Sequence, residues 1–321
     1  MKKRLIPILI FLIIFNLSGC GDTNVSDTSG DDKVLLQAID LLSKANSYEL
    51  TESRVESTTF GDKQYISQRT SITEEKIIVE PFVRWGRSDS TSSKIYLGGQ
   101  QRSLRESYQV LNNGQLDVYV RYSPTQDAAI GKEPVLGEWE KIPTFTKEQD
   151  AWTLDAMRNN FDAQLYLLSS NIDTFKKVEH YEVKDENIIK YEGYLEQTTI
   201  LEAYQKYIRD FWVKANLLKD SKNLSLEDLK NEIIDGGVLE IQVGIPMLAY
   251  SDEPVPISLW IDKNTFKLIK VTVDETLVMQ SYNEKEVLKN NPELGKPIVS
   301  EALLTYEIKS INNLNEIPMP D

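Results

Sequence analysis

Residues 258–273 of this 321-residue chain read SLWIDKNTFKLIKVTV. Apolar residues alternate with polar or basic ones on either side of the polar segment 262–265, and this alternation is typical of half-buried β-strands. The stretch therefore predicts a hairpin, with strands over 257–261 and 266–273 joined by that polar segment. Such a hairpin belongs to an antiparallel sheet with one face in the core.

Strand patterns fill much of the remaining chain. They cover 48–60, 64–80, 82–88, 94–97, 102–111, 116–122, 135–141, 176–183, 187–196, 239–247 and 301–311. Asn113-Gly114, between two of these runs, is the strongest turn signal for a hairpin. The early strands are rich in Ser, Thr, Glu and Arg, so we expect an antiparallel sheet that has one face in water.

Four segments have the three- and four-residue spacing of apolar residues that predicts amphipathic helices. One helix is expected from Val34, one from about Gln149 and one over 200–218. The fourth is expected to begin at Ser225, because Ser225 and Asp228 have the spacing of a capping box.

The N-terminal residues have the three parts of a secretory signal: a basic region, an apolar region and small residues before a cleavage site. Lys2, Lys3 and Arg4 form the basic region, and residues 5–15 are apolar apart from Pro7. This apolar stretch is about 11 residues long, whereas a membrane-spanning helix needs about 20. The segment 1–19 is therefore predicted to be a cleaved signal peptide.

Leu17, Ser18 and Gly19 lead directly into Cys20, and this segment resembles the lipobox of bacterial lipoproteins. That resemblance implies a diacylglycerol on the Cys20 sulfur and a protein anchored by lipid to the cell membrane, on its extracytoplasmic face. The alternative is an ordinary secretion signal followed by a chance cysteine.

The segment after Cys20 is predicted to be a flexible tether. Residues 21–33 contain one apolar residue, Val25, among Ser, Thr, Asp, Asn and Gly, which is too little to form a core. We therefore expect a lipidated tether over 20–33 and a single domain over 34–321, with a central helical insertion at about 149–236. Two domains are the alternative.

The charge of the chain argues against nucleic acid as a partner. There are 36 basic and 50 acidic residues, which give a net charge of −14. Loss of residues 1–19 would remove three of the basic residues and make the charge about −17. A surface this acidic repels phosphate backbones, which are bound through Lys and Arg.

The sequence lacks the residues of most catalytic and metal sites. Cys20 is the single cysteine and His180 the single histidine, so a zinc site of His and Cys ligands is excluded. There is no phosphate-binding or dinucleotide-binding glycine motif and no nucleophile elbow. We expect no catalytic residue, no metal and no cofactor, with a hydrolase that uses two carboxylates as a remaining alternative.

The order of elements resembles a known group of proteins. An N-terminal helix after a tether, long polar strands, Trp139-Glu140-Lys141 at the end of the first sheet region, central helices and the hairpin over 258–273 all contribute. Together they resemble the Gram-positive lipoproteins with a LolA/LppX-like fold, also called the outer-membrane lipoprotein carrier-like fold. The late strand pair of that family commonly reads Trp-Ile-Asp-x-x-Thr.

This resemblance implies an α+β fold in which a curved antiparallel sheet, an incomplete barrel, has helices over its concave face. It also implies a non-enzymatic lipoprotein that binds a lipid or a lipid-modified partner in a cavity between the sheet and the helices. Candidate cavity residues are Trp152, Phe161, Tyr204, Phe211, Trp212 and Trp260. The same residues would equally fill an ordinary core, so the alternative is an envelope sensor or protein-interaction lipoprotein.

Overall fold

An antiparallel sheet of eleven strands forms the centre of the fold. The structure is a computed structural model that describes residues 30–319 except 62–64, 95–98, 114, 124–133, 143–146, 180–186, 215–217, 222–223 and 236–243. The strands are β1 Ser47–Phe60, β2 Tyr65–Ile78, β3 Val83–Lys94, β4 Gly99–Asn112, β5 Gln115–Tyr122, β6 Glu140–Lys141, β7 Lys176–Lys177, β8 Ile188–Leu195, β9 Val255–Asp262, β10 Leu268–Asp274 and β11 Pro297–Ile311.

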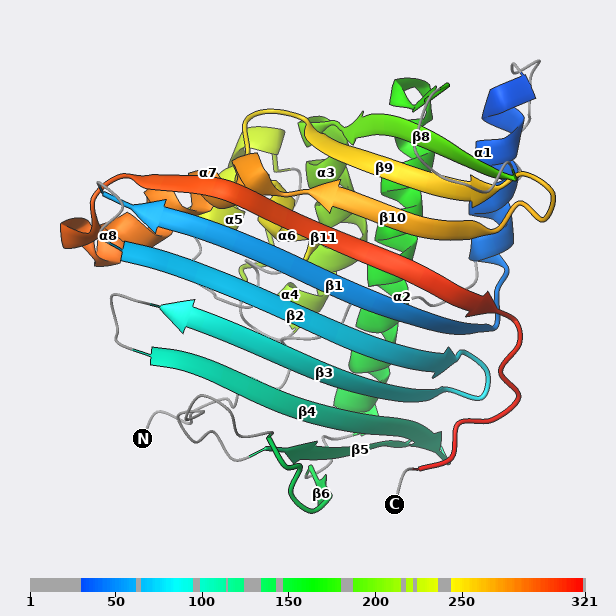
Figure 1. Ribbon diagram of the computed structural model, residues 1–321. Helices are drawn as coiled ribbons and strands as arrows, with labels where there is room; N and C mark the ends of the chain where they lie inside the picture. Colours follow the sequence, from blue (N-terminus) through cyan, green and yellow to red (C-terminus); the bar gives the residue numbers. More distant parts are fainter. Residues whose placement is uncertain are drawn as a thin grey trace.

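Two meanders make up this sheet. Their strand order is β6-β5-β4-β3-β2-β1-β11-β10-β9-β8-β7, so the first and last strands are neighbours in the middle. β6 and β7 form the two edges, and the sheet is therefore curved but not closed into a barrel (Figure 1). The predicted α+β fold with a curved antiparallel sheet is confirmed.

The hairpin that the sequence predicts is formed by β9 and β10. Ile257, Leu259 and Ile261 are buried on one face of β9, and the residues between them are partly exposed on the other. Asp262 Oδ1 accepts hydrogen bonds from the backbone N–H groups of residues 264 and 265, at 2.8 and 2.9 Å. This local bonding by an aspartate holds the turn between the two strands.

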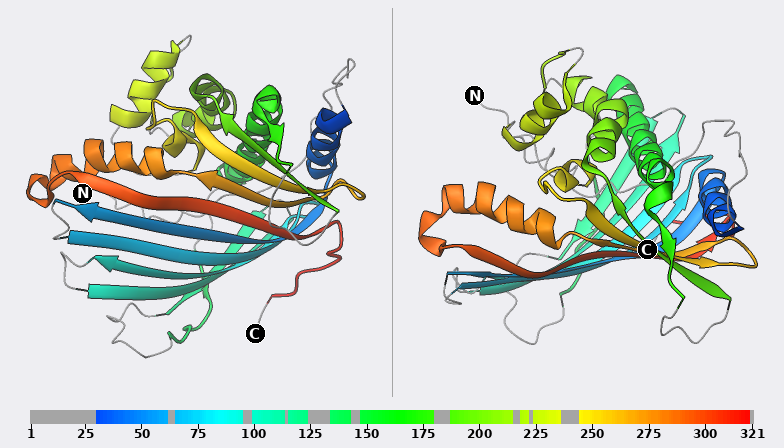
Figure 2. Two further views of the ribbon diagram at one scale, coloured as in Figure 1. Left: turned by 45° about the horizontal axis from the view of Figure 1, so that its top comes forward. Right: turned by 90° about the horizontal axis from the view of Figure 1, so that it is seen from above.

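The helices lie on one side of the sheet, over its concave face (Figure 2). They are α1 Gly30–Ser43, α2 Lys147–Ser170, α3 Gln197–Ala203, α4 Arg209–Lys214, α5 Leu226–Asp235, α6 Ile245–Leu248, α7 Thr276–Tyr282 and α8 Leu288–Asn290. The described part also contains two π-helical turns, Tyr204–Ile208 and Asn283–Val287, and two 3-10 turns, Ile172–Thr174 and Pro292–Leu294. Because α1 begins at Gly30, the last four residues of the predicted tether are helical.

α2 connects the two edges of the sheet. It follows β6 at one edge and precedes β7 at the other, so it crosses the concave face (Figure 1). Its 24 residues span roughly 36 Å at about 1.5 Å per residue. The helix predicted from Gln149 therefore begins slightly earlier, at Lys147, and covers the core from side to side.

The capping box predicted for the fourth helix is present at the start of α5. The backbone N–H of Ser225 donates to Asp228 Oδ2 at 3.0 Å, and the backbone N–H of Asp228 donates to Ser225 Oγ at 3.1 Å. Each side chain thus satisfies a backbone donor that the first turn of the helix leaves without a partner.

Several parts of the chain differ from the expectation. Of the predicted strands over 135–141 and 176–183, only residues 140–141 and 176–177 form strands within the described part. The residues at the end of the predicted strand over 239–247 form helix α6, Ile245–Leu248, and residues 239–243 lie outside the described part. Pro246 cannot donate a hydrogen bond to a neighbouring strand, whereas it fits the first turn of a helix. α7 and α8 have no counterpart among the predicted helices.

A small second core lies on the opposite, convex face. It contains Ile78 and Tyr108 of the sheet and Ile317 of the C-terminal tail. The Tyr108 hydroxyl donates a hydrogen bond to the backbone carbonyl of Ile317 at 3.1 Å. The tail is therefore fixed against the outside of β2 to β4, away from the helices.

Candidate functional site

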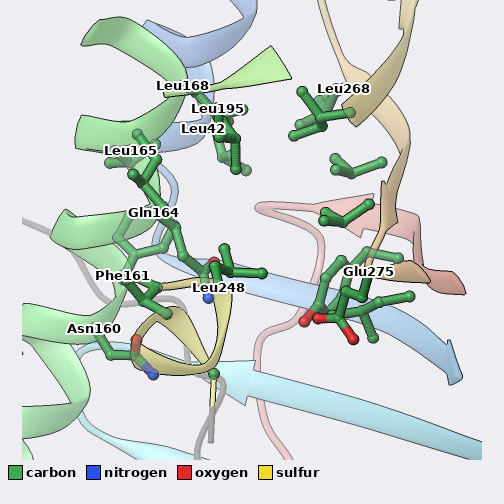
Figure 3. Close-up of a pocket in the computed structure, with 18 residues that line it drawn as sticks. Leu42, Asn160, Phe161, Gln164, Leu165, Leu168, Leu195, Leu248, Leu268 and Glu275 are labelled. Atoms are coloured by element: carbon green, nitrogen blue, oxygen red, sulfur yellow. The ribbon is translucent and has the colours of Figure 1, made fainter. Parts of the chain in front are cut away.

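An apolar pocket of about 100 Å³ lies between α2, α6 and the strands β9, β10 and β11 (Figure 3). It is partly open to solvent. The described residues that line it are Leu42, Asn160, Phe161, Gln164, Leu165, Leu167, Leu168, Leu195, Gly244, Ile245, Leu248, Ile257, Leu268, Val271, Val273, Glu275, Leu304 and Tyr306.

Helical and strand periodicity place these side chains together. Phe161, Leu165 and Leu168 follow one another at four- and three-residue spacing and therefore share one face of α2. On the sheet, Val271 is paired with Tyr306 and Val273 with Leu304 across β10 and β11. Paired residues of an antiparallel sheet point to the same face, so these four side chains form a continuous wall opposite α2.

The pocket has a polar group at one side, the carboxylate of Glu275. This residue directly follows β10 and occupies the N-cap position of α7, without a capping hydrogen bond from its side chain, and it is only 3 % exposed. Its two carboxylate oxygens contact the guanidinium of Arg54 on β1, at 3.1 and 3.3 Å. Burial raises the pKa of Glu275, and Arg54 partly opposes this shift.

A cluster of buried charges continues from Glu275 across the concave face of the sheet. Glu52 lies two residues before Arg54 on the same face of β1, and Glu75 on β2 is paired with Arg84 on β3. Burial and then the nearby Glu75 raise the pKa of Glu52 to about 7, against the opposing effect of Arg54. The cluster therefore contains three carboxyl groups and two guanidinium groups among the described residues, from Glu52, Arg54, Glu75, Arg84 and Glu275.

The raised pKa of Glu52 predicts a pH-dependent stability. Between its ordinary value of 4.5 and about 7 the folded protein holds a proton that the unfolded chain releases, so the free energy of unfolding falls as pH rises through this window. We expect Glu52→Gln to remove this dependence, which amounts to about 3 kcal/mol at most. Urea denaturation at pH 5 and at pH 8 measures the difference.

Glu49→Gln is the control for this prediction, because Glu49 lies on the other face of the same strand and contacts Lys76. It should keep the wild-type pH dependence. Equal slopes for Glu52→Gln and the wild type would contradict the role assigned to Glu52.

The structure brings one of the six predicted cavity residues, Phe161, into the pocket. Tyr204 is buried in the main core, where its hydroxyl donates to Glu232 Oε1 at 3.0 Å. Phe211 and Trp212 contact each other edge to face, with ring centroids 5.2 Å apart, in the same core. The side chain of Trp152 lies outside the described part of the structure.

Trp260 lies on the convex face and is not a cavity residue. Its neighbours along β9, Leu259 and Ile261, are buried on the opposite face, where the pocket lies. Its ring is flanked by the ammonium groups of Lys190 and Lys270, at 5.2 and 5.0 Å from the ring centroid. The alternation of β9 explains the error, because adjacent residues of a strand point to opposite faces.

A π-helical turn changes which aromatic residue of the central helix is most deeply buried. Residues Tyr204–Ile208 form this turn between α3 and α4, and such a turn advances the chain by one extra residue. Trp212 is buried as a result, whereas Phe211, which continues the predicted apolar stripe, is partly exposed.

Several predicted features lie outside the described residues: the signal segment, Leu17, Ser18, Gly19, Cys20 and His180. Within the described part, no helix is long and apolar enough to span a membrane. No group of three or more His, Cys, Asp or Glu side chains that could hold a metal ion occurs among the described residues.

Comparison with known proteins adds no relative: no protein-family model, curated protein or solved structure matches the chain. The likeness to LolA/LppX-like lipoproteins therefore stays a prediction.

Sequence reasoning missed most of the pocket, including Leu165, Leu168, Val271 and Glu275. The first two belong to the helix predicted from about Gln149, and the spacing of its apolar residues does not distinguish a cavity from a filled core. No local signal in the sequence identifies Glu275, because acidic residues are mostly exposed, whereas Glu275 is 3 % exposed.

Proposed function

We propose that the protein is a membrane-anchored extracytoplasmic lipoprotein that binds an apolar group without catalysing a reaction. The observation that carries the proposal is the pocket under α2, whose walls are formed largely by Leu, Ile, Val and Phe. Glu275 is the one carboxylate among its described lining residues. A glycosidase-type site needs two carboxylates across the substrate, so the pocket favours binding over hydrolysis.

The size of the pocket limits the ligand. A dry apolar cavity of about 150 Å³ can take up benzene, and the pocket is smaller, at about 100 Å³. It therefore suits one short alkyl segment, and a longer chain would extend through the open side. Burial of about four methylene groups contributes about 3 kcal/mol, so we expect weak binding from apolar contact alone, with a dissociation constant of about 6 mM.

Titration of 1-octanol into the chain from residue 20 with Cys20→Ser tests the proposal, because that chain keeps every described residue. We expect methyl NMR signals of Leu168, Val271 and Leu304 to shift, since these side chains line the pocket. Leu165→Trp should fill the partly exposed mouth and weaken binding at least about tenfold, or about 1.4 kcal/mol.

Val55→Trp is the matched control, because Val55 is exposed on the convex face and the added ring lies away from the pocket. Its affinity for 1-octanol should equal that of the parent chain. The proposal would be contradicted if 1-octanol did not bind, or if saturating 1-octanol left the methyl signals of the pocket unshifted. Either result would favour the alternative, an envelope sensor or protein-interaction lipoprotein with a filled core.

The anchor is tested separately with the full precursor expressed in a Gram-positive host. The parent protein should fractionate with membranes, and Cys20→Ser should release it or leave it unprocessed, because the thiol is the acceptor of the lipid. Identical membrane retention of both proteins would contradict lipidation at Cys20.

A further inference from the structure

The pocket has polar side chains on two sides. The more deeply buried side is formed by Glu275 and Tyr306, which both line the pocket and are both at least nine-tenths buried. In Figure 3 the Glu275 side chain lies across the pocket from Gln164 and Asn160 of α2. An amphiphile whose alkyl part lies among the leucines and whose head group lies on the sheet side would meet a carboxylate and a phenol.

This side of the pocket offers no free positive charge. No Lys, Arg or His occurs among the described lining residues. The nearest guanidinium, that of Arg54, is held by both carboxylate oxygens of Glu275. Glu52 lies on the same face of β1 as Arg54, and the cluster of Glu52, Arg54, Glu75, Arg84 and Glu275 holds three carboxyl groups for two guanidinium groups.

We infer that the pocket selects amphiphiles with an uncharged or cationic head group that donates hydrogen bonds, such as an alkyl alcohol or alkylammonium, over alkyl carboxylates. This inference rests on the proposed function. A hydroxyl or ammonium group can donate to the Glu275 carboxylate, and an ammonium group also offsets the excess negative charge. A carboxylate head would add a further buried anion beside Glu275, which is strongly unfavourable without a partner.

Three ligands that differ only in their head groups test the inference: octylamine, 1-octanol and octanoate, titrated at pH 7.5 and constant ionic strength. We expect the amine and the alcohol to bind at least tenfold more tightly than octanoate, measured from the shifts of the pocket methyl groups. Octanoate that binds as tightly as 1-octanol would overturn the inference and leave the apolar pocket intact as a binding site.

Glu275→Gln provides the matched variant. It removes the carboxylate and frees Arg54, so octanoate should bind several-fold more tightly and octylamine several-fold more weakly than in the parent chain. Glu49→Gln, on the other face of β1, should change neither affinity. An unchanged order of the three ligands in Glu275→Gln would contradict the role of this carboxylate.

The outcomes separate the inference from the proposed function. If none of the three ligands shifts the pocket methyl groups, the proposed function itself fails. If Glu275→Gln does not fold, the order of the three ligands in the parent chain still decides the inference.

Discussion

Replacing Arg84 by methionine is expected to lower the free energy of unfolding by about 3–5 kcal/mol. Arg84 is 3 % exposed and is paired with the buried Glu75 on the neighbouring strand. One carboxylate oxygen of Glu75, Oε2, already lacks a hydrogen-bond partner within the described structure. Without the guanidinium, Glu75 would be a buried charge with no counterion, or would have to take up a proton. Chemical denaturation at pH 7 measures the loss.

The double variant Arg84→Met/Glu75→Leu shows whether the loss in free energy of unfolding comes from a buried charge without a partner or from the absence of the ion pair itself. Removing both partners leaves no uncompensated charge, so the double variant should be close to wild-type stability or above it. Arg102→Met is the control: Arg102 pairs at 2.7 Å with Asp89 at a half-exposed site, where loss of a pair costs about 1 kcal/mol or less. Equal effects of Arg84→Met and Arg102→Met would contradict the prediction.

Phe161→Ala is expected to cost about 3–5 kcal/mol, which is typical for removal of a buried aromatic ring. The side chain is fully buried, lines the pocket and contacts the ring of Tyr48, with centroids 6.2 Å apart. Its removal joins new space to the pocket. We therefore expect the variant to be less stable and to bind 1-octanol more tightly than the wild type. Saturating 1-octanol should then raise the free energy of unfolding of the variant by more than it raises that of the wild type.

Phe211→Ala is the matched control, because Phe211 is partly exposed and does not line the pocket. It should lose less stability and leave the affinity for 1-octanol unchanged. A Phe161→Ala protein that binds 1-octanol no better than the wild type would contradict the enlargement of the pocket.

Local sequence signals predicted the parts of the fold that local interactions determine. The β9–β10 hairpin follows from strict alternation and from a turn that Asp262 holds by its own side chain. The start of α5 follows from the reciprocal bonds of Ser225 and Asp228. The polar strands β1 to β4 are paired in the order of the sequence, as expected, whereas the pairing of β1 with β11 joins distant segments.

The site was harder to predict because it is assembled from distant segments. Leu42, Phe161, Ile245, Val271 and Leu304 belong to five different elements that meet only in the folded chain. Whether their side chains leave a space depends on packing, which periodicity does not describe. Trp260 is the exception, since the alternation of its strand already predicts that it lies on the opposite face from Leu259.

The pairing of β1 with β11 has a consequence for how the chain reaches its fold. Asn46 and Asn312 are 266 positions apart, yet the backbone N–H of Asn46 donates to Asn312 Oδ1 at 2.6 Å beside this pair of strands. Contacts so distant in sequence require closure of a very long loop, and a high contact order slows folding. Before the fifteen residues of β11 pair with β1, the backbone groups at the edges of β1 and β10 that face β11 in the folded protein have no partner strand. We therefore expect the C-terminal strand to complete folding, so that a chain ending before Pro297 would expose two aggregation-prone edges where the native sheet has its middle.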